Sequence, residues 1–328
     1  MMNTFAHSLR LGVLFGSLAV SAMASAATIN VQTDKPGHKI APTLWGVFFE
    51  DINLSADGGI YPEQVRNRSF EDAEKPEFWN FANVGDGKSE AVIDLGRPLN
   101  AFNKRHLRVK LDGAFTLENG GYYGMGIAKG ERYTFRAALR GENFSGPLIV
   151  KVLSADGKEL ASGEIKGSSD GWKYQTLDLT ATDGDAKAKL QISASGKGVL
   201  FLDMVSLLPK QTWKNHGLRP DLAEAMGALK PTLFRFPGGC WVEGDTMDKA
   251  YDWKKTIGNI DARTPLWNIW QYNATHSIGY HEYLQMAEDL GAEPMFCINV
   301  GMSHKETVPL DQMGRWVQDA LDALEYAN

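Results

Sequence analysis

Apolar and polar residues alternate through the middle of the chain, with the period of two that half-buried β-strands show. The clearest run has apolar side chains at every second position, namely Tyr133, Phe135, Ala137 and Leu139. Turn-forming dipeptides occur at Asn119-Gly120, Asp156-Gly157, Asp170-Gly171 and Asp183-Gly184. Short strands separated by such turns predict an antiparallel β-sandwich over residues 76–208, with Val199 to Val205 as its last strand.

The flanking regions have a different pattern, in which continuous apolar runs alternate with apolar residues at helical spacing. The runs cover residues 44–49, 232–236 and 294–300. The helical spacing occurs at residues 222–229, 280–290 and 310–324. Apolar strands that alternate with helices are typical of a parallel sheet whose strands are buried on both faces.

Three strand–helix units fit either a doubly wound sheet or a TIM barrel. No GxGxxG motif follows the first strand, which argues against the dinucleotide-binding form of the doubly wound sheet. A closed barrel needs eight units and about 250 residues, whereas this chain has three units and stops within the third helix. The expected fold is therefore α/β plus all-β, a partial (β/α)8 TIM barrel with an inserted antiparallel β-sandwich.

The strand and helix patterns divide the mature chain into three parts. Residues 27–75 hold the first barrel strand and the loop after it, 76–208 the inserted sandwich, and 209–328 the continuation of the barrel. The preceding residues have the pattern of a secretory signal, because the apolar run Leu11 to Val20 is followed by small residues up to Ala26. A membrane anchor, the alternative, needs about 20 apolar residues. We expect residues 1–26 to be a signal peptide and the protein to be secreted or periplasmic.

Composition narrows the function classes. The chain of 328 residues is 43% hydrophobic and 23% charged, as in soluble globular proteins. A net charge of -6 argues against a nucleic-acid partner, and no basic amphipathic helix indicates a membrane surface. Cys240 and Cys297 are too few for a disulfide framework, and a single bridge between them stays open. The histidines form no HExxH motif or paired cluster, so no metal site is expected.

Three motifs lie where the predicted parallel strands end, and a TIM barrel carries its active site at that end. They are FFEDIN from Phe48, FRFPGGCWVEG from Phe234 and AEDLGAEPMFCINVG from Ala287. In these motifs the chain resembles the α-L-arabinofuranosidases of glycoside hydrolase family 51, in particular a subgroup with a carbohydrate-binding-like sandwich of jelly-roll type inserted after the first barrel strand. The resemblance covers most of the mature chain, and FRFPGGCWVEG is its specific element.

The resemblance implies an activity and a set of substrate-binding residues. Enzymes of this family release terminal arabinofuranosyl residues from polymers such as arabinan or arabinoxylan with retention of configuration, and they use no metal or other cofactor. The implied substrate-binding residues are Glu50, Arg235, Gly239, Cys240, Trp270 and Asn299.

Each of these residues has an expected role, and some also have a simpler structural explanation. Glu50 matches a buried acid that hydrogen-bonds sugar hydroxyls; otherwise it is a salt-bridged glutamate at a strand end. Arg235 matches an arginine beneath the nucleophile, where its charge keeps a carboxylate ionised; otherwise it belongs to a structural ion pair. Trp270 matches an aromatic wall of the sugar pocket, and a core position explains a lone tryptophan equally well.

The remaining expected roles concern the backbone and two polar positions. Gly238 and Gly239 allow the backbone to approach the sugar closely. Cys240 stands where many relatives have asparagine, and a thiol is a weaker hydrogen-bond donor than an amide. Asn299 matches a polar residue at the end of the third strand.

No catalytic residue is expected in this chain. A retaining glycosidase needs two carboxyl groups about 5–5.5 Å apart, and the family places its two glutamates on the fourth and seventh strands, beyond Asn328. Glu50 and Asp51 are a poor substitute because neighbours on a strand point to opposite faces. Glu243 and Asp245 lie on a predicted loop with no geometry that favours a catalytic pair.

Two other functions remain open at this point. The first is a carbohydrate-binding protein without catalysis, made of the sandwich and a vestigial barrel. The second is a related barrel glycosidase of different specificity, such as an endoglucanase. The sequence leaves the polysaccharide, the linkage and the oligomeric state undecided.

Overall fold

The structure is a computed structural model that describes residues 27–167 and 171–328. The described residues 27–40 and 41–328 belong to separate units, and all strands and helices of the described residues lie in the second. The predicted signal peptide lies outside the described residues. Within them, no helix combines the length and apolar character that crossing a membrane requires.

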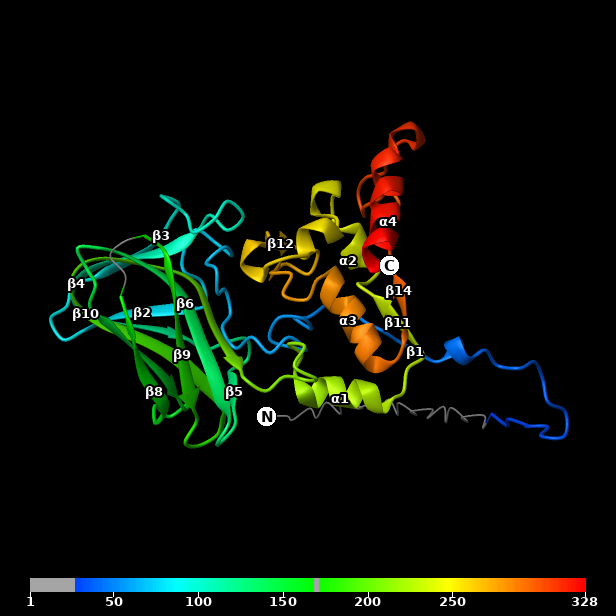
Figure 1. The fold of residues 1–328 in the computed structure, drawn as a ribbon, viewed down its shortest axis with the longest axis horizontal. Coiled ribbons are helices and arrows are strands. Elements are labelled where there is room, and N and C mark those ends of the chain that lie inside the picture. The colour runs from blue at the N-terminus through cyan, green and yellow to red at the C-terminus, as the bar shows by residue number, and fades with distance from the viewer. Residues whose placement is uncertain (1–26, 168–170) are drawn as a thin grey trace, which may run out of the picture. The chain divides into compact units, whose positions relative to one another are not determined.

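Residues 79–209 form an antiparallel β region (Figure 1). Its strands are β2 (Trp79–Val84), β3 (Glu90–Asp94), β4 (His106–Asn119), β5 (Met125–Ile127), β6 (Arg132–Glu142), β7 (Pro147–Leu153), β8 (Glu159–Lys166), β9 (Lys173–Thr180) and β10 (Asp185–Pro209). The predicted apolar face of β6 is confirmed, since Tyr133, Phe135, Ala137 and Leu139 are all buried in one large apolar cluster. The alternation stops at Ala137, because every residue from Ala137 to Gly141 is buried, including Arg140.

The longest strand, β10, differs from its prediction. The sequence suggested a strand over 199–205, but β10 runs from Asp185 to Pro209 and pairs with β4, β5, β6 and β7. The segment before Val199 contains Gly196 and Gly198, which weaken any strand signal. At Gly198 the backbone has a φ of 130°, and a Cβ would lie 2.5 Å from the carbonyl oxygen of Asn143. Glycine therefore lets the ladder continue where a side chain would collide.

The three apolar runs form a separate parallel sheet. Its strands are β1 (Gly46–Phe48), β11 (Leu233–Phe236) and β14 (Glu293–Phe296), in the order β1-β11-β14. Both pairings are parallel, so the predicted order is confirmed. Phe234 and Phe236 of β11 are fully buried and pack against Tyr283 of the helix α3 (Tyr280–Leu290), with the rings of Phe236 and Tyr283 5.1 Å apart.

The expectation that all three strands are buried on both faces is wrong for the outer two. Phe48 of β1 is 49% exposed and Met295 of β14 is 45% exposed. Both strands are edges of a three-stranded sheet, so each lacks a neighbour on one side. Helix α3 covers only the face that carries Phe234 and Phe236.

The remaining helices are α1 (Pro220–Ala228), α2 (Cys240–Glu243) and α4 (Gly314–Ala327). Proline at the first position starts α1, and Gly291 in the left-handed conformation (φ 67°) ends α3. In α4 only Ala323 is buried, while Val317, Leu321 and Leu324 are more than half exposed.

The connections hold the short elements. These are the 3-10 helices η1 (Pro42–Leu44), η2 (Met247–Lys249), η3 (Trp253–Thr256), η4 (Ile260–Ala262) and η5 (Leu310–Gln312), and the two-stranded hairpin of β12 (Leu266–Trp267) and β13 (Asn273–Ala274). Most lie between β11 and α3, where the sequence predicted no regular structure. Several contacts tie this connection to the β region; among them, Asp261 accepts a hydrogen bond from the Tyr174 hydroxyl at 2.8 Å and pairs with Arg136 at 2.7 Å.

Candidate functional site

Glu50 lies two residues after the end of β1, and its carboxylate is held by backbone amides of the segment after β11. Its Oε1 accepts hydrogen bonds from the N–H of Gly239 at 3.0 Å and of Trp241 at 2.9 Å. The backbone of Gly238 passes so close that a Cβ there would lie 2.7 Å from Oε1. Glu50 is therefore fixed by neutral donors, which disfavours the reading as a salt-bridged strand-end glutamate.

Arg235, in the middle of β11, lies on the sheet face opposite to α3. Parallel pairing places it level with Phe48 and Met295. Its Nε donates to Sγ of Cys297 at 3.1 Å, and its guanidinium carbon lies 4.5 Å from the centre of the Phe48 ring. Within the described residues no carboxylate forms an ion pair with Arg235, so the structural ion-pair reading has no support here.

Cys240 begins α2, between the two amides that bind Glu50. Burial, followed by the negative charges of Glu50 and Glu243, raises the pKa of its thiol. Both cysteines are free, so the bridge that the sequence left open is not formed. The next side chain, Trp241, is buried and packs on Tyr251, and this contact anchors α2.

Asn299 organises the loop after β14. Its Nδ2 donates to the carbonyl oxygens of Val242 at 3.0 Å and Met302 at 2.9 Å, and its Oδ1 accepts from the amides of Gly301 at 2.7 Å and Met302 at 3.1 Å. Both ends of the amide are thus engaged with backbone. Asn299 connects this loop to α2, and its polar atoms are occupied within the protein.

Trp270 lies in the connection between β12 and β13, partly buried against the apolar cluster around Phe236. Within the described residues no hydrogen bond or ring contact joins it to Glu50 or Cys240, so its position fits a core role at least as well as the pocket wall. The neighbouring Tyr272 reaches the first strand instead. Its hydroxyl donates to the backbone oxygen of Asp51 at 2.8 Å and lies 3.1 Å from the Asp51 carboxylate.

Asp51 is a buried acid whose importance the sequence did not reveal. Burial, with a smaller contribution from the charge of Asp57, raises the pKa of Asp51 to about 7. Its Oδ1 accepts from the amide of Ala56 at 3.1 Å. Glu50 and Asp51 thus have different partners, as expected for neighbours on a strand. An acid next to a strand-end glutamate was the only available signal.

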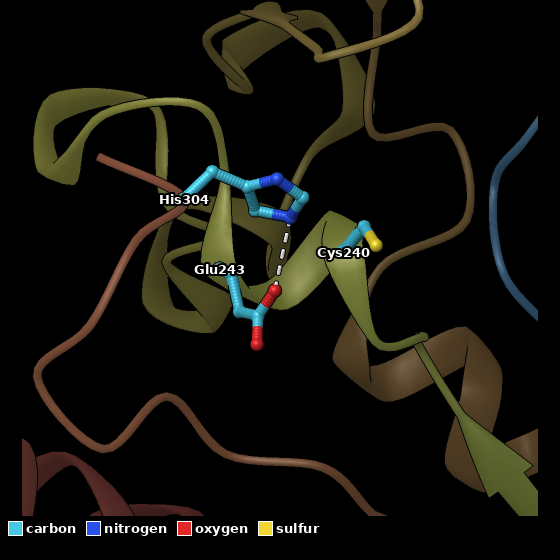
Figure 2. A group of neighbouring side chains, drawn as sticks. All are labelled: Cys240, Glu243 and His304. Atoms are coloured by element: carbon cyan, nitrogen blue, oxygen red, sulfur yellow. Dashed lines mark ion pairs between the residues drawn. The ribbon is translucent and has the colours of Figure 1, made fainter. Parts of the chain in front are cut away.

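The prediction that Glu243 and Asp245 both lie on a loop is wrong for Glu243, which ends helix α2, and both carboxylates contact basic side chains. Glu243 Oε2 lies 3.0 Å from Nε2 of His304, and Asp245 pairs with Lys305 at 2.7 Å. Figure 2 shows Cys240 and Glu243 on α2 with His304 facing them from the loop after β14. These contacts give both carboxylates a role in holding that loop.

Comparisons with known proteins agree with the motifs. Residues 225–328 match the family model described as the alpha-L-arabinofuranosidase 1 domain. The chain is 35% identical over 319 residues to "Alpha-L-arabinofuranosidase 1" of Arabidopsis thaliana, which covers 92% of this chain and 47% of the relative. It is 36% identical to "Extracellular exo-alpha-L-arabinofuranosidase" of Streptomyces chartreusis, over 92% of this chain and 38% of the relative.

A solved structure gives the same result. The arabinose-bound MgGH51 α-L-arabinofuranosidase superposes with a TM-score of 0.82 at 28% identity, over 89% of this chain and 50% of that chain. The resemblance to family 51 arabinofuranosidases is therefore confirmed. The chain spans about half the length, or less, of the relatives that it matches.

Proposed function

Because the chain is similar to family 51 α-L-arabinofuranosidases over about nine-tenths of its length, we propose that it forms the sugar-binding part of a retaining α-L-arabinofuranosidase. The substrate is a terminal arabinofuranosyl residue of arabinan or arabinoxylan. The protein is secreted or periplasmic in this proposal, in keeping with the word "Extracellular" in the name of the Streptomyces chartreusis relative.

One observation carries the proposal, namely the orientation of the Glu50 carboxylate at the C-terminal end of a parallel strand. Both amides bind Oε1, and within the described residues no donor reaches Oε2. A fixed carboxylate oxygen without a partner is a strong acceptor for a sugar hydroxyl. The strand end is also where TIM-barrel enzymes place their substrates.

The proposal includes the finer fold. In a (β/α)8 barrel the helices lie outside and the opposite side chains point inward. Helix α3 covers the face of β11 that carries Phe234 and Phe236, which assigns the row of Phe48, Arg235 and Met295 to the interior. The antiparallel region over about 76–208 is, in this proposal, a carbohydrate-binding-like sandwich inserted after the first barrel strand.

The test measures sugar binding, because the proposal assigns Glu50 to contact with the sugar. The purified chain is titrated with L-arabinose and an aryl α-L-arabinofuranoside by calorimetry, beside Glu50→Ala and the control Glu224→Ala on the exposed side of α1. Loss of a charged hydrogen bond weakens binding by roughly 10- to 100-fold, and we expect this for Glu50→Ala only. Equal binding by Glu50→Ala and the parent would overturn the assignment and favour sugar binding by the β region alone.

A further inference from the structure

Three side chains of different chemistry meet beside the candidate sugar site. Cys240 and Glu243 lie one turn apart on α2, and His304 faces them from the loop after β14 (Figure 2). The thiol sulfur, one carboxylate oxygen and one imidazole nitrogen all lie within 4.8 Å of one another. We propose that Cys240, Glu243 and His304 form a binding site for a divalent cation of the zinc type.

The ligand set selects the cation. Thiolate, imidazole and carboxylate are the zinc ligands in proteins, and three protein ligands with one open position are typical of accessible zinc sites. Calcium and magnesium prefer oxygen ligands throughout. In a tetrahedral zinc site the ligand atoms are roughly 3.3–3.8 Å apart, given metal–ligand bonds of about 2.0–2.3 Å. The observed spacings, 3.0 Å for Glu243–His304 and up to 4.8 Å for the set, bracket that range.

The backbone holds the three ligands in place without using their side chains. The amide of His304 donates to the carbonyl oxygen of Gly244 at 3.0 Å, directly after α2. Asn299 donates to the carbonyl oxygen of Val242, and the amide of Met247 donates to the Glu306 carboxylate at 2.6 Å. The loop is therefore fixed on α2 in advance, which lowers the entropic cost of binding a cation.

The cluster has no strong role as an ion pair. His304 and Glu243 are 36% and 35% exposed, and an ion pair at such exposure stabilises a fold by about 1 kcal/mol at most. A bound cation favours the deprotonated thiolate as a ligand. This site does not depend on whether Glu50 binds sugar.

The experiment uses the purified chain without a polyhistidine tag, freed of metal by a chelator and dialysed. Zn²⁺ is titrated by calorimetry, and Co²⁺ by absorbance, where a thiolate ligand gives a charge-transfer band in the near ultraviolet. We expect saturable binding of one ion, with loss of that band in Cys240→Ser. Removing a group that merely supports a ligand costs about 10- to 100-fold in affinity, so His304→Ala should weaken Zn²⁺ binding by at least roughly tenfold.

Two control variants complete the design. His216→Ala removes a histidine that pairs with Asp289 at 2.7 Å and is 41% exposed, which makes it a match for His304 outside the cluster. Cys297→Ser removes the other free thiol. Both should bind Zn²⁺ like the parent, and circular dichroism confirms that every variant is folded. Absence of saturable binding by the parent, or unchanged binding by folded Cys240→Ser and His304→Ala, would overturn the proposal.

Discussion

Two neighbouring glycines offer a sharp test of how the Glu50 carboxylate is held. At Gly238 the backbone has a φ of 153°, and a Cβ would lie 2.7 Å from both Cγ and Oε1 of Glu50. At Gly239 the φ is -110°, and a Cβ would meet no atom within 4 Å. Alanine should therefore be costly at the first position and tolerated at the second.

The magnitude follows from the strain and the collision together. A side chain in a backbone conformation reserved for glycine costs of order 1–3 kcal/mol, and the overlap with Glu50 adds to this unless the carboxylate moves. For a unit of this size, an unfolding entropy of about 2.1 cal/mol/K per residue converts such a loss into a fall in Tm of roughly 2–5 °C. Gly239→Ala should leave Tm nearly unchanged, because a Cβ there meets no atom within 4 Å.

Thermal unfolding followed by circular dichroism measures the two Tm values, and sugar titration measures the site. Gly238→Ala should lose both stability and binding, since the Glu50 carboxylate is displaced. Gly239→Ala should retain stability, and any loss of binding there would point to contact between this backbone and the sugar. Equal Tm values for Gly238→Ala and the parent would refute the argument that glycine is needed for the approach of Glu50.

Two further predictions concern the acid beside Glu50 and the packing of the sheet. The pKa of Asp51 is raised from 3.8 to about 7, so its contribution to stability is complete below about pH 4, falls as pH rises, and is lost above about pH 7. Over this range the contribution of Asp51 to the free energy of unfolding changes by about 4 kcal/mol. In Asp51→Asn the slope of Tm against pH between 4 and 7 should therefore flatten. An unchanged slope would contradict the raised pKa of Asp51. In urea unfolding, Phe236→Ala should lower the free energy of unfolding by about 3–5 kcal/mol. Phe48 is 49% exposed, so Phe48→Ala should lower it by about 1 kcal/mol or less. Similar losses for the two variants would mean that the face of Phe48 is covered.

The periodic parts of the chain could be predicted because burial repeats with the geometry of the element. In the first half of β6 every second side chain is buried, and in α3 the buried residues Tyr283, Met286 and Ala287 follow the helical period. The extent of β10 could not be predicted, because the ladder through Gly196 and Gly198 depends on close backbone contact rather than on side chains. The exposure of β1 and β14 could not be predicted for another reason. The sequence of an apolar strand does not reveal whether a neighbouring strand covers its edge.

The candidate site likewise contains contacts that the sequence predicts and contacts that it does not. That Glu50 and Gly239 meet follows from two strand ends in one parallel sheet, which sequence order predicts. The partners of Asn299 are backbone groups of Val242, Gly301 and Met302, and no residue pattern encodes them. The contact of His304 with α2 could not be predicted from the sequence either, because His304 reaches α2 only through the loop whose conformation Asn299 stabilises.

Cys240 connects the two sites, because α2 serves both. The amides on either side of this residue bind Glu50, while its thiol faces Glu243 and His304. A substitution at Cys240 therefore affects the orientation of α2 and the cation ligands together, and its effect on sugar binding alone is ambiguous. His304 has no part in holding Glu50, and Gly239 contributes no side chain to the cation. If Zn²⁺ weakens sugar binding in the parent, His304→Ala should abolish that effect, whereas Gly239→Ala should preserve it.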